Sequence, residues 1–503
     1  MKNISSQKAK KNIIYGTITR VITIAIGIIM PKLVIVNLGS ESNGLLTSVG
    51  NILTYLSLLE AGVGTASIQA LYKPFAENDR KSVNGIMAAT DYFYKRTGIA
   101  YLVGVCLLAI GYTVFVETQI PKIEVFLVVF ITGLSGVIGY FVQGKIRIFL
   151  TAEGKNYVVA NITTFTNIGA NIAKAIAIKM GANVVLIQAT YFAFAVLQML
   201  LYCFYFRREY KWVDLKVKPD FEAISQKNAV LVHQISWLIF SNTDTLLLTF
   251  FVSLKAVSVY NMYMLVFGIV ESVVDMMANS FLYSLGQSFH NREVFLKKYN
   301  AYETIYFAVT FSLFCLTIIL AIPFMKLYTE GVSDANYIDL VVAWEFLFYF
   351  LLNNARVPAR NVINIAQKFN ETKYRSLLES IINIIASLIL TKRFGIYGVL
   401  IGTIVALLYR TNDMIIYSSR IIKRSPWVTY RKIIRNSLIF SAIMVIIRHM
   451  TINPLDYPSF ALCGFLLAVC VIPVFFAGNL VFERETMRYA FSVLKRMILP
   501  PKA

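Results

Sequence analysis

A series of long, uninterrupted apolar stretches constrains this sequence more than any other feature. The chain has 503 residues, of which 57% are hydrophobic and only 15% are charged. A helix that crosses a bilayer needs about 20 apolar residues, so this fraction is enough for about fourteen such helices. The stretches do not alternate apolar and polar residues, as the strands of an outer-membrane barrel do. The pattern excludes a soluble enzyme, a disordered chain, a coiled coil and a protein with a single anchor. It predicts an all-α polytopic membrane protein.

The apolar stretches predict fourteen transmembrane helices. We place them at 13–37, 44–71, 97–117, 123–150, 156–179, 183–206, 228–253, 257–285, 301–327, 337–362, 374–391, 395–419, 433–449 and 459–482. Counted loop by loop, 37 Lys and Arg residues fall on one side and 7 on the other. The positive-inside rule therefore puts both termini in the cytoplasm. It also accounts for most of the net charge of +21, so no nucleic-acid partner is expected.

An internal repeat predicts how the helices are grouped. Residues 12–38 align without gaps on 228–254, and the segment that begins at Gly181 aligns on the segment that begins at Gly395, an offset of 214. We predict two pseudo-symmetric six-helix lobes, at 1–218 (helices 1–6) and 219–425 (helices 7–12). Residues 426–503 would hold an extra helix pair and a cytoplasmic tail. Parallel repeats of this kind are typical of transporters, in which the substrate site lies at the repeat interface.

Four short motifs carry a resemblance to a known family. They are NLGSESNGL at 37–45, LEAGVG at 59–64, AVSVYN at 256–261 and FGIYGVLIG at 394–402. With the fourteen-helix layout, they resemble the Wzx-type polysaccharide flippases, which serve O-antigen, capsule or teichuronic-acid-like polymers. This family belongs to the multidrug/oligosaccharidyl-lipid/polysaccharide exporter superfamily, with the lipid II flippases and the MATE drug exporters.

The resemblance implies a function and a location. The protein is expected in the bacterial cytoplasmic membrane, where it would flip an undecaprenyl-diphosphate-linked oligosaccharide to the outer leaflet by alternating access. Its expected partners are this lipid-linked substrate and the membrane lipids, with polysaccharide polymerase or assembly proteins as further candidates.

Basic residues inside the apolar stretches are the candidates for the substrate site. A charge in mid-bilayer costs about 2.5–3.5 kcal/mol on insertion scales, so it should face a cavity or a partner. Guanidinium groups bind pyrophosphate through bidentate hydrogen bonds. The candidates for a diphosphate and glycan cavity are Arg20, Lys174, Arg356, Arg360, Lys145 and Arg147. The last four lie toward the cytoplasmic ends of their helices, where snorkelling is the alternative explanation.

Acidic residues inside the same stretches have two interpretations. Glu60, Asp244, Glu271 and Asp275 are either coupling sites for a cation or proton, or counter-ions of the basic residues. Arg410 and Asp413 are three residues apart on one helix face, so we predict a structural ion pair. The histidines and cysteines are scattered through the chain, and neither a metal nor another cofactor is expected.

One P-loop-like motif is a decoy. Residues 139–145 fit GxxxxGK, but Ile146 replaces the Ser or Thr that would bind magnesium, and no strand is predicted before the motif. Closely spaced glycines in an apolar helix more often permit close helix packing.

Three alternatives to a flippase fit the sequence less well. A MATE-like cation-coupled antiporter of drugs or small molecules would prefer an anionic, aromatic cavity. A membrane enzyme would need a sizeable loop domain, whereas the predicted outer loops are short, so no catalytic residues are expected. A scaffold without transport would not need the repeat or the intramembrane charges. We therefore expect a transporter.

Overall fold

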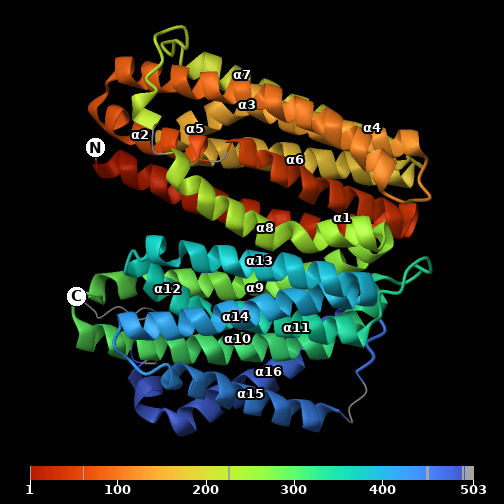
Figure 1. Cartoon of the computed structure of the whole chain (residues 1–503), viewed down its shortest axis with the longest axis vertical. Coiled ribbons are helices and arrows are strands. Elements are labelled where there is room, and N and C mark those ends of the chain that lie inside the picture. Colours follow the sequence, from red (N-terminus) through yellow and green to blue (C-terminus); the bar gives the residue numbers. More distant parts are fainter. Residues whose placement is uncertain (1, 61, 225–226, 449–451, 490–491, 493–503) are drawn as a thin grey trace. The chain divides into compact units, whose positions relative to one another are not determined.

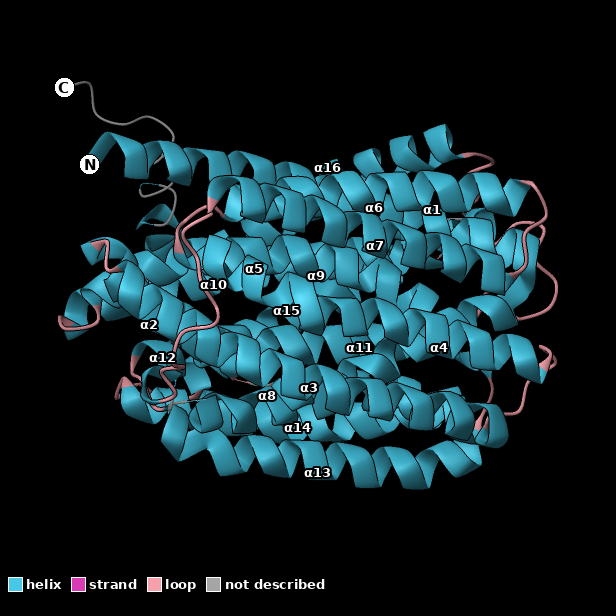
Figure 2. Ribbon diagram, turned by 90° about the horizontal axis from the view of Figure 1, so that it is seen from above, coloured by secondary structure: helices cyan, strands magenta, loops and turns pink. Residues whose placement is uncertain are grey.

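The computed structural model describes residues 2–60, 62–224, 227–448, 452–489 and 492. In this part of the chain the regular secondary structure is all helical and contains no strand. Figure 2 shows helices joined by short loops that gather at the helix ends. The predicted fold class is confirmed: the chain is an all-α polytopic membrane protein.

Figure 1 labels the α-helices of the first half of the chain. In chain order, the helices of this half are α1 (Lys2–Leu56), η1 (Ser57–Glu60), α2 (Val63–Glu77), α3 (Arg80–Phe115), α4 (Lys122–Ile138), η2 (Gly139–Gln143), α5 (Gly144–Ala152), α6 (Asn156–Lys179), α7 (Val184–Glu209), η3 (Glu222–Ile224) and α8 (Lys227–Phe251). Among them η1 and η3 are 3₁₀-helices, and η2 is a π-helix.

The remaining helices belong to the second half of the chain. They are α9 (Leu254–Ser288), α10 (Arg292–Tyr328), α11 (Leu340–Ala355), α12 (Val357–Ile365), α13 (Phe369–Phe394), α14 (Ile396–Ile421), α15 (Trp427–Ile447) and α16 (Tyr457–Phe482).

Each predicted span has a counterpart in these helices, but the boundaries differ. The first predicted span and the first part of the second run together in α1, across a kink at Gly39 with φ 82°, and the second span ends in α2. The helix α3 begins at Arg80, well before the predicted residue 97, because Asp79 caps it by accepting hydrogen bonds from the backbone of Lys81 and Ser82. Within the described residues, nine helical segments are individually long and apolar enough to cross a membrane.

The chain divides into two compact units. The first unit contains Met1–Ser258 and the short segment Val332–Ala335, and the second contains Val259–Gly331 and Asn336–Ala503. These units reflect spatial packing, whereas the boundaries at 218 and 425 describe a sequence repeat. The three-part division by repeat therefore stays a prediction.

Polar hydrogen bonds connect α1 to α8 and to the first turns of α9 inside the first unit. Asn43 donates to Ser258 over 2.8 Å, and Asn51 donates to Thr245 over 3.0 Å. Gly44 permits this close approach, because an added Cβ would lie 1.8 Å from the carbonyl oxygen of Leu254. Small residues and interhelical hydrogen bonds are the usual means of helix association in a bilayer, where apolar contact alone gives no preference for protein over lipid.

Aromatic side chains fill the core of the second unit. Phe346 stacks with Tyr263 at a centroid distance of 5.7 Å, and Phe350 stacks with Phe267 at 5.6 Å. These residues lie on α9 and α11, and all four are buried. The stacked rings hold the two helices in one register beside the polar clusters described below.

Candidate functional site

The fourth predicted helix is continuous, but a π-turn interrupts its regular α-helical pattern just before the candidate cations Lys145 and Arg147, and we call this turn the break. The helix consists of α4, the π-helical turn η2 and α5. π-Turns inside α-helices occur frequently at functional sites. The decoy motif at 139–145 therefore lies in a continuous helical segment, which lacks the strand and loop of a phosphate-binding P-loop.

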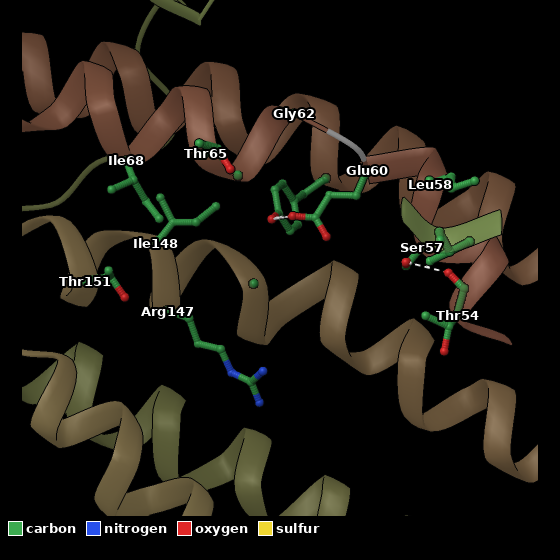
Figure 3. Close-up of a pocket in the computed structure, with 14 residues that line it drawn as sticks. Thr54, Ser57, Leu58, Glu60, Gly62, Thr65, Ile68, Arg147, Ile148 and Thr151 are labelled. Carbon is green, nitrogen blue, oxygen red and sulfur yellow. Dashed lines mark hydrogen bonds between the residues drawn. The ribbon is translucent and has the colours of Figure 1, made fainter. Parts of the chain in front are cut away.

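Two adjoining cavities in the first unit surround this break. One has a volume of about 560 Å³ and the other about 460 Å³. Both are lined by Thr54, Ser57, Glu60, Tyr94, Gly144 and Arg147. Figure 3 shows Glu60 and Arg147 on different helical segments around the larger one. The lining of the second cavity adds tyrosine, glutamine, serine and threonine side chains, so this intramembrane space is polar.

Arg147 is the candidate cation that the cavity leaves most available. Its Nη2 donates to Gln143 over 2.9 Å and to Gln198 over 3.3 Å, and its guanidinium lies 5.4 Å from the ring centroid of Tyr202. Its Nε is buried and has no hydrogen-bond partner among the described residues. Within the described residues Arg147 belongs to no ion pair, so its charge is left for water or a ligand in the cavity to stabilise.

Glu60 supplies the opposite charge in the same cavity. It ends the 3₁₀-helix η1, where the second predicted span is interrupted before α2. Its carboxylate accepts a hydrogen bond from the hydroxyl of Tyr94 and interacts electrostatically with Arg147. The arrangement combines one cation, one anion and neutral donors, which suits a ligand that is only partly anionic.

The other candidate cations of the first unit have different surroundings. Lys145 is paired with the buried carboxylate of Asp91, which also binds Lys95 over 2.7 Å. Lys174 lies on α6, with its Nζ 4.5 Å from the ring centroid of Tyr191, a residue of the smaller cavity wall. The side chain of Arg20 lies outside the described residues.

In the second unit, Arg356 is not available as a free cation. It lies at the junction of α11 and α12, where it pairs with Glu379 and donates from Nε to Asn353 over 3.1 Å. Both side chains of the ion pair are 9% exposed. Asn353 also donates to Glu271 over 2.6 Å. These contacts bring Arg356 and Glu271 into one network, in which the guanidinium charge is already balanced.

Arg410 and Asp413 belong to the same buried region. The two form an ion pair at 2.5 Å, and Asp413 also binds Arg375 over 2.6 Å. Arg410 is 2% exposed and lies 3.5 Å from Glu379. The structure thus joins three arginines and two carboxylates from the start of α12, α13 and α14.

Three candidates remain, which are Arg360, Asp275 and Asp244. Arg360 lies on α12 and is close enough to Glu271 to interact electrostatically. Asp275 lies one turn after Glu271 on α9. Asp244 is 3% exposed on α8, in the first unit. Within the first unit Arg147 and Glu60 line the same cavities, and within the second unit the contacts above connect Arg356, Arg410 and Asp413.

Two acidic residues outside the predicted candidates hold the second unit together. Glu379 lies within the predicted span 374–391, so the rule that an intramembrane charge needs a partner could have found it. Glu303 lies within the span 301–327 and is fully buried, with Arg424 and Lys432 at 2.9 and 3.0 Å. None of these contacts is local, so the partners could not be named from sequence.

Comparison with known proteins identifies solved structures that have a similar fold. No protein family model and no curated protein sequence matches the chain. A solved structure of the lipid II flippase MurJ, in an inward closed conformation, is similar with a TM-score of 0.72 and 14% identity, covering 94% of this chain and 99% of that chain.

Two transporters of another kind are also similar. An inward-facing multidrug resistance MATE family transporter of the MOP superfamily gives a TM-score of 0.66 at 13% identity, covering 80% of this chain and 94% of that chain. The MATE multidrug transporter DinF-BH, solved as a ligand complex, gives 0.56 at 15% identity, covering 83% and 96%. The chain therefore has the multi-pass helical fold that the MurJ flippase shares with the MATE transporters.

Proposed function

We propose that the protein is a transporter that flips an undecaprenyl-diphosphate-linked oligosaccharide across the bacterial cytoplasmic membrane, as a Wzx-type flippase with both termini in the cytoplasm. It moves its substrate by alternating access and carries out no covalent chemistry. The substrate is both a lipid and a polar glycan, so the polar part needs a hydrated path through the bilayer.

The observation that carries this proposal is that Arg147 lines both cavities and, within the described residues, belongs to no ion pair. An oxygen of a diphosphate accepts from a guanidinium through a strong, charge-assisted hydrogen bond. Glu60 faces the same cavity and would limit the affinity for the anion, so that the substrate is released after crossing.

The test is translocation of a fluorescent undecaprenyl-diphosphate sugar in vesicles that contain the purified protein. Wild type should move the lipid, and Arg147→Ala should slow this movement at least about tenfold, as expected for the loss of one charged hydrogen bond. Lys145→Ala is the matched control, because its ammonium already pairs with Asp91. Equal rates for wild type and Arg147→Ala would contradict the proposed site.

A MATE-like antiporter of cationic compounds is the second candidate. Glu60 and several tyrosines in the cavity wall favour it, because carboxylates and aromatic rings bind organic cations. Expulsion of a cationic dye against a pH or sodium gradient, without movement of the sugar lipid, would select this function. Loss of that expulsion in Glu60→Gln would then identify the cation site.

A further inference from the structure

The glycines along the broken helix differ in what surrounds them. An added Cβ at Gly133 would lie 2.3 Å from Val105, at Gly136 2.4 Å from Tyr101, and at Gly144 2.2 Å from Tyr94. These three positions need glycine because α3 packs against them. At Gly139 an added Cβ would meet nothing within 4 Å.

Gly139 lies in the wall of the smaller cavity, at the start of the π-turn. Its φ of −54° is ordinary for any residue, so neither backbone strain nor packing requires a glycine here. The missing side chain instead leaves room in the cavity. A larger residue would fill space that a ligand could otherwise occupy.

Apart from Glu60 and Arg147, the side chains that line the smaller cavity are uncharged, and several of them are polar. Tyr140 and Gln143 come from the π-turn, Ser135 from α4, and Tyr191 and Gln198 from α7. Hydroxyl and amide groups both donate and accept hydrogen bonds, and a tyrosine ring adds an apolar face. This combination matches the hydroxyls and the apolar ring faces of a sugar.

The separation between Arg147 and Gly139 indicates how long a ligand must be to contact both. Eight residues separate the two, which corresponds to about 12 Å along a helix with a rise of 1.5 Å per residue. The cavity volume of about 460 Å³ lies within the range of about 300–1,000 Å³ that small-molecule sites occupy. A phosphate held by Arg147 therefore leaves space for a sugar in front of Gly139.

We propose that the π-turn Gly139–Gln143, with Tyr191 and Gln198 of α7, forms a subsite for an uncharged, hydroxyl-bearing sugar next to the diphosphate at Arg147. This inference rests on the proposed function and adds to it a position for the glycan. Gly139 is the residue that determines how large a sugar the subsite accepts.

The experiment measures equilibrium binding of short-chain analogues to the full-length protein in detergent. The probes are geranyl diphosphate without a sugar, geranyl-diphospho-glucose and geranyl-diphospho-N-acetylglucosamine. Wild type should bind at least one sugar-bearing analogue about tenfold more tightly than geranyl diphosphate, because one or two additional hydrogen bonds give a gain of this size.

The variant Gly139→Leu should lose this tenfold preference and keep the affinity for geranyl diphosphate, with Gly139→Ala in between. Gly111→Leu on α3 is the matched control, because an added Cβ there also meets nothing within 4 Å and Gly111 does not line this cavity. Thermal unfolding of each variant shows whether it is folded.

The outcomes separate the two proposals. If Arg147→Ala lowers the affinity for all three analogues but wild type shows no preference for a sugar, or Gly139→Leu retains that preference, the subsite is wrong and the flippase proposal stands. If wild type binds none of the three analogues, or if Arg147→Ala binds them as wild type does, the diphosphate site fails, and the subsite fails with it.

Discussion

Two helices that are interrupted at repeat-related positions use their basic residues in opposite ways. The repeat offset of 214 residues carries the π-turn Gly139–Gln143 onto 353–357, which contains the junction of α11 and α12. In the first unit the break leads to Arg147, whose Nε is buried without a partner among the described residues. In the second unit it leads to Arg356, which is balanced by Glu379 and Asn353.

This difference shows that an intramembrane cation is not by itself a binding site. A buried charge is tolerated either because other protein groups pair with it or because a cavity admits water and ligand. Arg356 belongs to the first class and Arg147 to the second. The comparison predicts that variants of the second unit change stability, whereas Arg147 variants change transport.

The largest expected effect is on Glu379. Replacing it by Gln leaves Arg356 and Arg410 without a shared carboxylate, and breaking a buried pair in this way costs about 3–5 kcal/mol. The thermal unfolding midpoint in detergent measures the loss. Glu371→Gln is the control on the same helix, since its pair with Lys368 is about half exposed and solvent screens it. Similar midpoints for the two variants would break the comparison.

A smaller effect is expected from the arginines at the two breaks. Arg356→Met should lower the free energy of unfolding by about 2–3 kcal/mol, below the range for a fully broken buried pair, because Arg410 remains beside Glu379. Arg147→Met should lower it by less than about 1 kcal/mol, because it removes a donor that also lacked one partner. Unfolding midpoints and lipid translocation are measured on the same preparations.

The reverse pattern would contradict this interpretation of the two breaks. It would consist of full translocation with Arg147→Met and a specific loss of translocation, at unchanged stability, with Arg356→Met. The substrate cations would then have to be sought in the second unit.

The smallest expected effect is on the two lysines that share Asp91. Lys145→Ala should destabilise the protein by about 1 kcal/mol and Lys95→Ala by at most about 0.5 kcal/mol, because exposed ion pairs contribute little. The side chain of Lys145 is 17% exposed, whereas that of Lys95 is 58% exposed. Neither variant should slow translocation at equal protein levels. A tenfold slower translocation in Lys145→Ala alone would make Lys145 a substrate contact after all.

The sequence by itself was sufficient for the fold class. Long apolar stretches need no knowledge of contacts to be recognised as membrane helices, because a bilayer imposes the same length and polarity on each of them. The same reasoning identified Arg147, Arg356 and Glu60 as charges that need an explanation. It placed the start of α3 incorrectly, because a capped polar helix can continue beyond the apolar segment.

Only the tertiary structure decided which charges are paired. Glu379 is 23 residues from Arg356 and 31 residues from Arg410, and these separations follow no local helix period. The π-turn at Gly139–Gln143 could not be predicted either, because the sequence there fits a regular α-helix. Hydropathy is a property of each segment, whereas the neutralisation of a charge depends on the distance to a group on another helix, which packing alone determines.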